Sequence, residues 1–227
     1  MAVEPRRVKR SELAQMIDHT NLKPDATDED ITRLCHEAKE YRLKAVVVNP
    51  TNVPFAAGLL RDSQVRVCSV VGFPLGATTT QTKASETEEA IRNGASEIDM
   101  VSDIGALKSG RVRDVRSDIE SVLRVTRARG VILKVIIEAP LLTDDEKVKI
   151  CHAAKDVGVD FVKSCTGFAG NAKPEDIRLI RKIVGDTLGV KAAGGIRSYL
   201  DALSMIDAGA SRIGTSSGVA IAKEAPE

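Results

Sequence analysis

The sequence predicts an α/β fold, a single-domain (β/α)8 TIM barrel over residues 1–227. Eight short runs of β-forming apolar residues alternate with segments of helical spacing and charged faces. The runs are continuously apolar, which is typical of parallel strands covered by helices. Eight such units fit a barrel at the small end of its size range, and no Pro/Gly/Ser-rich linker divides the chain. An open doubly wound sheet is the alternative, but the first strands are not followed by G-x-G-x-x-G.

The strands are expected, in chain order, where β-branched residues cluster between turn residues. They are MIDHT (16–20), KAVVVN (44–49), VRVCSVVGF (65–73), SEIDMVS (96–102), VILKVIIEA (131–139), VDFVKS (159–164), GVKAAGG (189–195) and ASRIGTS (210–216).

Helices are expected between these strands, together with a short helical extension before the first strand. The clearest are residues 27–41, 79–94, 113–130, 143–158 and 173–189. Two of them begin with a capping box, Thr27 with Asp30 and Thr143 with Glu146. Glycines at 94, 130, 158 and 209 mark the points where helices end.

Composition excludes several classes of protein. With 33 basic and 32 acidic residues, the chain has no electrostatic footprint for nucleic acid or a membrane surface. Its one basic cluster, EPRRVKR (4–10), is interpreted as a short solvated tail. No apolar run reaches the roughly 18 residues of a membrane span, and the N-terminus lacks a signal-peptide core. Four scattered cysteines without a C-x-x-C pair indicate reduced thiols, so we expect a cytoplasmic protein.

Charged residues lie near the carboxyl ends of several expected strands, which is where barrel enzymes carry their chemistry. They are Asp99, Lys134, Glu138, Lys163 and Lys191. Each alone could be a strand end that meets solvent, or half of a structural ion pair. Two lysines and an aspartate that converge on one mouth indicate a functional site, because isolated buried charges cost several kcal/mol each.

Imine formation is the chemistry that needs two lysines beside one carboxylate. A lysine attacks a carbonyl only as the free amine, so the pKa of Lys163 must fall from its usual value near 10.4. We expect the Lys191 ammonium, about 5 Å away, to lower it by repulsion. Desolvation by Phe161 and Phe168 would act in the same direction. Asp99 would then move protons to and from the intermediates.

Metal and thiol chemistry are poorly supported. The three histidines, His19, His36 and His152, show no metal-ligand spacing, so we expect no metal and no cofactor. Cys165 follows Lys163 by two residues, but no histidine is placed by local sequence to activate it. We interpret Cys165 as a packing residue.

Two glycine-rich turns predict a phosphate site. AAGGIRS (192–198) ends the seventh expected strand and RIGTSSG (212–218) ends the eighth. Glycines let the backbone approach an anion, and the amides at the start of a following helix are free to bind it. The candidates are Gly194, Gly195, Gly214, Ser216 and Ser217, joined by Gly167 of the CTGF segment.

These residues, in this order, resemble the 2-deoxyribose-5-phosphate aldolase family. The resemblance runs through MIDHTNLKPDAT, VVVNP, VVGFPLGATTTQTKASETEEAIRNGASEIDMV, IGALKSG, LKVIIE, DFVKSCTGF, KAAGGIRS and GTSSG, nearly the whole chain. It implies a metal-independent class I aldolase on a barrel, often dimeric, that reversibly cleaves 2-deoxy-D-ribose 5-phosphate to D-glyceraldehyde 3-phosphate and acetaldehyde.

The resemblance also assigns roles. The Schiff-base lysine falls on Lys163, the proton-transferring aspartate on Asp99 and the second lysine on Lys191. The expected substrate-binding residues are Asp18, Thr20, Thr166, Gly167, Gly194, Gly195, Arg197, Gly214, Ser216 and Ser217.

Four positions depart from the family's usual residues: Val47, Ser102, Asp103 and Cys165. None is one of the three catalytic positions, so we expect the reaction to be retained. Two alternatives stay open. One is another Schiff-base phosphosugar lyase or transaldolase-like barrel, and the other is a non-catalytic barrel that binds phosphate.

Overall fold

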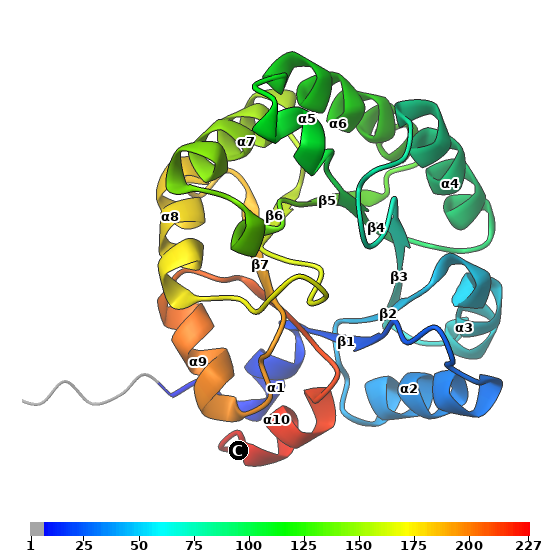
Figure 1. The fold of residues 1–227 in the computed structure, drawn as a ribbon. Helices are drawn as coiled ribbons and strands as arrows, with labels where there is room; N and C mark the ends of the chain where they lie inside the picture. Colours follow the sequence, from blue (N-terminus) through cyan, green and yellow to red (C-terminus); the bar gives the residue numbers. More distant parts are fainter. Residues whose placement is uncertain (1–6) are drawn as a thin grey trace, which may run out of the picture.

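The protein folds into a closed barrel of eight parallel strands, which confirms the predicted (β/α)8 fold (Figure 1). The structure is a computed structural model that describes residues 7–227. Each strand pairs with its sequence neighbours, and β8 closes the barrel on β1. The strands are β1 Ile17–Asn21, β2 Ala45–Val48, β3 Arg66–Val71, β4 Glu97–Val101, β5 Ile132–Ile136, β6 Phe161–Lys163, β7 Gly189–Ala193 and β8 Arg212–Thr215.

Helices surround the barrel and cover its outer face (Figure 1). They are α1 Arg10–Ala14, α2 Asp28–Glu40, α3 Val53–Leu60, α4 Thr80–Arg92, α5 Ile104–Lys108, α6 Val112–Arg127, α7 Asp144–Val157, α8 Pro174–Val184, α9 Tyr199–Asp207 and α10 Gly218–Glu224, with 3-10 turns η1 Pro50–Asn52 and η2 Ala139–Leu141. Of these, α3, α5, α9 and α10 were not singled out from the sequence. Strips of apolar side chains on the helices pack against the outward side chains of the strands.

The helix ends that capping residues and glycines predicted are confirmed, whereas the helix expected over 173–189 ends earlier, at Val184 before Gly185. Thr27 and Thr143 both form complete capping boxes, and Gly158 ends α7 in the left-handed conformation. The glycines at 94, 130 and 209 also have positive φ. Local polar residues and glycines therefore set where these helices begin and end.

Strand lengths differ from the expectation. β6 is only three residues long, because Lys163 is the last residue in register with β7 and the chain then turns away at Thr166–Gly167. β3 ends at Val71, since Gly72 has a φ of 62° and leaves the strand conformation.

The N-terminal extension is packed rather than a solvated tail over its described part. Residues 4–6 of the basic cluster lie outside the described residues. Val8 is buried, and its backbone N–H donates to the hydroxyl of Tyr199 at 3.0 Å. Arg10 opens α1 and pairs with Glu227 at the other end of the chain. The first described residues therefore pack against the C-terminal residues and α9.

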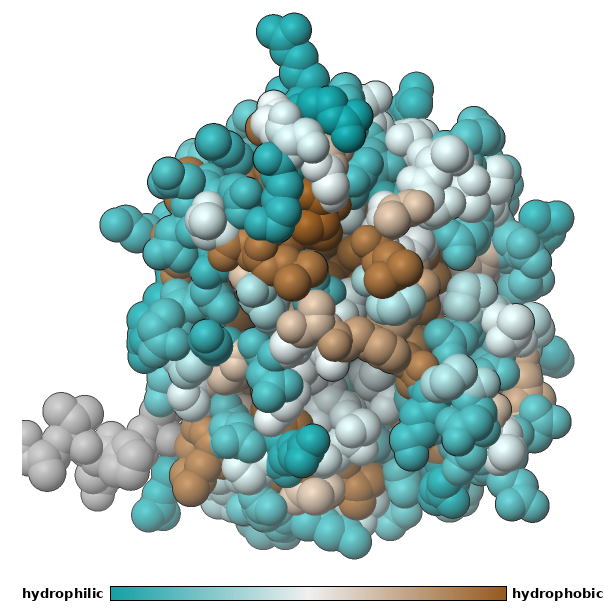
Figure 2. Space-filling model, viewed as in Figure 1, coloured by the Kyte–Doolittle hydropathy of each residue, from teal (hydrophilic) through white to brown (hydrophobic). Residues whose placement is uncertain are grey.

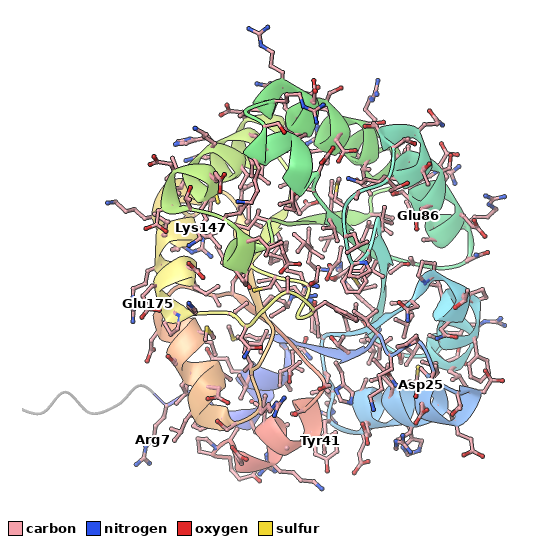
Figure 3. The ribbon with its side chains drawn as sticks, in the orientation of Figure 1. Arg7, Asp25, Tyr41, Glu86, Lys147 and Glu175 are labelled. Atoms are coloured by element: carbon pink, nitrogen blue, oxygen red, sulfur yellow. The ribbon has the colours of Figure 1, made fainter. Side chains whose placement is uncertain are left out.

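Strand register brings the charged residues into one region of the barrel. Asp99 lies opposite Lys134 between β4 and β5, and Lys163 lies opposite Lys191 between β6 and β7. Alternate side chains of a barrel strand point inward. All four side chains consequently enter the barrel interior, where Figure 3 shows a dense packing of sticks.

Ion pairs also tie the helices of the outer ring together. Lys147 of α7, labelled in Figure 3, reaches Asp176 of α8 at 2.6 Å.

No helix within residues 7–227 is long and apolar enough to cross a membrane.

Candidate active site

The interior of the barrel holds a layer of charged side chains beneath its mouth. All belong to strands, and each is less than 5% exposed. They are Asp18 (β1), Glu97 and Asp99 (β4), Lys134 (β5), Lys163 (β6), Lys191 (β7) and Arg212 (β8). A buried charge is tolerated only when it is paired, so their mutual arrangement decides what this layer can do.

Asp99 joins the two lysines that the sequence singled out. Its Oδ2 accepts a hydrogen bond from Lys163 Nζ at 2.9 Å and another from Lys191 Nζ at 2.8 Å. Because both donors share one oxygen, the two nitrogens lie within about 6 Å of each other, a distance at which like charges repel strongly in a buried site. The structure thus brings Lys163, Asp99 and Lys191 together as one cluster.

Lys134 holds the other oxygen of the same carboxylate. Its Nζ donates to Asp99 Oδ1 at 2.8 Å and pairs with Glu97 Oε2 at 2.6 Å. The thiol of Cys68 also donates to Asp99 Oδ1, at 3.3 Å. Asp99 is therefore fixed from both sides, with Oδ2 turned toward the reactive lysine.

Lys134 was noted from the sequence without a role, and Glu97 and Arg212 were not singled out. Glu97 could have been found from strand alternation, since it is two residues before Asp99 and shares its inward face.

Asp18 lies below the mouth rather than on the wall of the substrate pocket, where we expected it. Its carboxylate is fully buried, with Lys191 Nζ 2.5 Å from Oδ2 and Arg212 Nη1 2.5 Å from Oδ1. Burial by itself would raise the pKa of Asp18, but Lys191, Lys134 and Arg212 together lower it to about 2. Asp18 is thus a permanent anion that keeps a positive charge on Lys191.

The pKa values of the two lysines move in opposite directions. Burial is the main cause that lowers the pKa of Lys163, and repulsion from Lys191 adds to it, while Asp99 opposes both. Burial would also lower the pKa of Lys191, but Asp18 and Asp99 outweigh it and raise that pKa. Lys163 is accordingly the lysine that gives up its proton, and Lys191 is the one that keeps it.

This result changes the expected cause of activation. Desolvation comes first and the second ammonium adds to it, whereas we expected the ammonium to dominate. Phe168 is 61% exposed and lies on the wall of the cavity that also contains Lys163. Phe161 instead lies against the guanidinium of Arg212, 5.4 Å from the ring centre.

A cavity of about 640 Å³ opens above Lys163 at the mouth of the barrel. Of the predicted site residues, its wall contains Lys163, Thr20, Thr166, Gly167, Gly194, Gly195, Arg197, Gly214 and Ser216. Asp18, Asp99, Lys191 and Ser217 do not line it. Sequence reasoning missed other lining side chains, including Lys23, Arg33 and Asn171.

The glycine turns after β6 and β7 meet at one side of this cavity. Gly167, Gly194 and Gly195 all have positive φ. A Cβ on Gly195 would come within 2.6 Å of the Asn171 side chain, so a larger residue in this turn after β7 would force Asn171 to move. Closely packed glycine backbone is what a phosphate-binding turn requires.

The turn after β8 departs from the expectation. The backbone N–H of Ser217 donates to the Thr215 hydroxyl at 2.9 Å, so this amide is already used. A Cβ on Gly214 would lie 3.0 Å from Cε of Lys191. Gly214 therefore makes room for the Lys191 side chain, which is a different role from holding an anion.

The positions that depart from the family's usual residues lie outside the charged cluster. Asp103 caps α5 through a bond from the Ala106 backbone N–H, and Ser102 donates to the Ile136 carbonyl. Val47 is buried beside Cys68. Burial raises the pKa of the Cys165 thiol to about 12, which suits the packing role predicted for it.

His19 lies next to the cavity. His19 is buried and pairs with Glu37 at 2.7 Å on the outer side of β1. Within residues 7–227, no group of three or more His, Cys, Asp or Glu side chains is arranged to hold a metal ion.

Comparison with known proteins agrees with this geometry. Residues 12–224 match the model of the DeoC/LacD family aldolases. The chain belongs to this family. Its barrel is thus that of an aldolase.

Several curated relatives carry one name. Deoxyribose-phosphate aldolase from Carboxydothermus hydrogenoformans is 55% identical, covering 94% of this chain and 95% of the relative. The enzyme of that name from Thermococcus kodakarensis is also 55% identical, over 97% of this chain and 100% of the relative. Among solved structures, tetrameric deoxyribose phosphate aldolase from Aeropyrum pernix superposes with a TM-score of 0.89 at 34% identity, covering 94% of this chain and 91% of that one.

Proposed function

We propose that this aldolase reversibly cleaves 2-deoxy-D-ribose 5-phosphate to D-glyceraldehyde 3-phosphate and acetaldehyde through an imine on Lys163. One observation carries the proposal. Two buried lysines share one carboxylate oxygen under a cavity, and only the lysine that faces the cavity has a lowered pKa. The names of the relatives point to the same substrate.

The first stage joins the sugar to the enzyme. The lone pair of Lys163 Nζ attacks the C1 carbonyl of the open-chain sugar, and the C1 oxygen takes up a proton to give a carbinolamine. Water leaves as the iminium forms, with its proton supplied from the Asp99–Lys191 pair. Burial would raise the pKa of Asp99, but Lys134, Lys163 and Lys191 hold it well below its usual value, so Asp99 is the acceptor of the pair. Lys191, charged in the resting site, is the member that gives a proton during turnover and regains it afterwards.

The second stage breaks the carbon–carbon bond. The C3 hydroxyl gives its proton to Asp99 as the C2–C3 bond breaks, and its electrons move toward the iminium nitrogen. Glyceraldehyde 3-phosphate leaves with the aldehyde formed at C3. The remaining enamine is protonated at C2, and addition of water to the iminium releases acetaldehyde and restores the free amine of Lys163.

Phosphate recognition is proposed for the turns after β6, β7 and β8. The support is that Gly167, Gly194, Gly195 and Ser216 all line the cavity on one side, with Arg197 beside them. Backbone amides and a guanidinium would together hold the dianion.

Thr20 and Thr166 line the same cavity. We propose that their hydroxyls orient those of the sugar. Such positioning would keep C1 of the sugar within reach of Lys163.

Incubation with 2-deoxy-D-ribose 5-phosphate tests the proposal directly. We expect formation of glyceraldehyde 3-phosphate in a coupled assay, with undiminished activity in EDTA and none in Lys163→Met. Loss of activity in EDTA would favour metal-dependent chemistry. Binding of the sugar without turnover would favour the non-catalytic barrel, and turnover of other phosphosugars alone would favour the transaldolase-like alternative.

Cellular location and oligomeric state are proposed as follows. We propose a cytoplasmic enzyme, supported by four cysteines that are all buried and unbridged. A homodimer without nucleic-acid or membrane partners stays a prediction, and light scattering after gel filtration would test it.

A further inference from the structure

Glu138 has an unusual backbone directly after β5. Its φ and ψ are 52° and 56°, the left-handed conformation that glycine favours. Only one other non-glycine residue within the described chain, Arg42, has positive φ. The sheet pairing continues around Glu138, because the amides of Ile137 and Ala139 donate to the carbonyls of Lys163 and Ser164. The strained residue is therefore held between two fixed points.

The Glu138 side chain is buried without a cation. It is 3% exposed, and within residues 7–227 it forms no ion pair. In the described part of the chain its carboxylate accepts from one group, the backbone N–H of Thr166, whose nitrogen is 3.2 Å from Oε1 and 3.3 Å from Oε2. Both the backbone strain and the buried carboxylate cost free energy, which indicates that the contact with Thr166 has a functional role.

Thr166 begins the turn that carries one wall of the active site. Its hydroxyl accepts the backbone N–H of Phe168 at 3.0 Å, which closes the turn around Gly167. A Cβ on Gly167 would lie 3.7 Å from the Cα of Gly194. Further along, the same loop contacts the 3-10 turn after Glu138, because a Cβ on Gly170 would meet Pro140 at 2.8 Å. Figure 1 shows these two segments over the barrel mouth.

We propose that Glu138 is a positioning residue, whose carboxyl oxygen holds the Thr166–Phe168 turn so that Gly167 is correctly placed against Gly194 for the phosphate of the substrate. The left-handed backbone aims the side chain at the Thr166 amide. The inferred role depends on reach, meaning that the side chain is long enough to bring an acceptor oxygen within hydrogen-bonding distance of that amide. It does not depend on the negative charge. The inference rests on the proposed cleavage of a phosphosugar.

Two conservative variants separate reach from charge. Glu138→Asp keeps the carboxylate but is one methylene too short, whereas Glu138→Gln loses the charge and keeps an oxygen at the right distance. We expect Glu138→Asp to raise KM for deoxyribose 5-phosphate about fivefold, the effect of one lost hydrogen bond, with little change in its activity on unphosphorylated 2-deoxyribose. Glu138→Gln should stay within about twofold of wild type on both sugars.

Hydrogen–deuterium exchange gives a readout that does not depend on turnover. The amides of residues 164–173 should exchange faster in Glu138→Asp and at the wild-type rate in Glu138→Gln. Glu86→Asp is the matched control, since Glu86 accepts the Gly72 amide at 2.8 Å in the loop after β3. It should affect exchange at residues 72–79 alone and leave the preference for the phosphorylated sugar intact.

The outcomes distinguish the two proposals. A wild-type protein that does not cleave the sugar contradicts the proposed function, and the exchange rates still decide the role of Glu138. Wild-type exchange and KM in Glu138→Asp would overturn the inference. So would a Glu138→Gln variant impaired while Glu138→Asp is normal, because charge would then matter and reach would not.

Discussion

Lys163 and Lys191 are the same residue type, donate to the same oxygen and still differ in proton affinity. Their other partners cause the difference. Lys191 has Asp18 as a second anion at 2.5 Å. Among residues 7–227, Lys163 pairs with Asp99 alone, and Lys191 and Lys134 also bind that carboxylate. A single shared carboxylate cannot offset burial for Lys163, so its pKa falls. The chemistry therefore depends on Lys191 having two carboxylate partners while Lys163 shares one.

The pH dependence of activity follows from this division. Since the pKa of Lys163 is lowered, its reactive amine persists to lower pH than that of an ordinary lysine, and activity declines as pH falls through that pKa. Lys191→Leu removes a repelling charge and frees Asp99 to attract the Lys163 ammonium. The acidic limb of kcat/KM should thus move to higher pH, and a pH series of the cleavage rate would show it. Lys182→Leu, at an exposed position, is the control, and an unmoved limb in Lys191→Leu would mean that the two ammoniums do not interact.

At the residue scale, the sequence was informative where strand periodicity and turn chemistry decide the outcome. Lys163, Lys191 and Asp99 could be found because all three lie near the carboxyl ends of apolar strands, which a parallel barrel brings to one mouth. Asp18 was misplaced because depth along a strand depends on the stagger of β1 against β8, which local sequence does not contain. Glu138 was noticed as a charge, but its left-handed backbone and its contact with Thr166 arise only in the folded chain.

The elements were predicted well wherever a local signal marks an end. The capping boxes at Thr27 and Thr143 and the glycine ends of four helices are encoded within four or five residues. Strand ends were predicted less accurately, because pairing with a neighbour determines them. The short β6 is an example, since its last pair is Lys163 with Lys191.

The cap of α7 offers a quantitative test at the scale of one element. The Thr143 hydroxyl accepts the Glu146 backbone N–H at 3.3 Å, and the Glu146 side chain accepts the Thr143 N–H at 2.8 Å. Thr143→Ala should lower the free energy of unfolding by about 1 kcal/mol, measured in urea, without changing the cleavage rate. Thr143→Ser keeps the hydroxyl and should remain near wild type. Equal stability of the alanine variant would show that the cap contributes nothing.

On the scale of the whole molecule, the barrel is closed around a charged layer instead of a purely apolar one. The mouth carries exposed apolar side chains, Leu75, Leu141 and Phe168, from the loops after β3, β5 and β6. Apolar surface gathers over the face that Figure 2 shows. In the layer beneath, burial would raise the pKa values of Asp18 and Asp99, but the lysines and arginine around them lower both, so the folded state favours their ionised form.

Acid should therefore unfold the protein through these carboxylates. The pKa of Asp18 is about 2 in the folded protein against an ordinary 3.8, so its contribution is present above pH 3.8 and is lost as pH falls toward 2. The size of that contribution is about 2 kcal/mol. Urea unfolding between pH 5 and pH 3 should show a shallower pH dependence in Asp18→Asn than in wild type.

Asp62→Asn, at an exposed aspartate without an ion pair in the described chain, is the control and should keep the wild-type slope. If Asp18→Asn also kept the wild-type dependence of unfolding free energy on pH, Asp18 would not contribute to acid unfolding.

The central claim is that Lys163, and neither of its two buried lysine neighbours, forms the imine. Borohydride reduction in the presence of acetaldehyde, followed by peptide mass mapping, tests it most directly. We predict one two-carbon adduct, on the peptide that contains Lys163, and none in Lys163→Met. An adduct on Lys191 or Lys134, or a wild-type protein left unlabelled, would contradict the account.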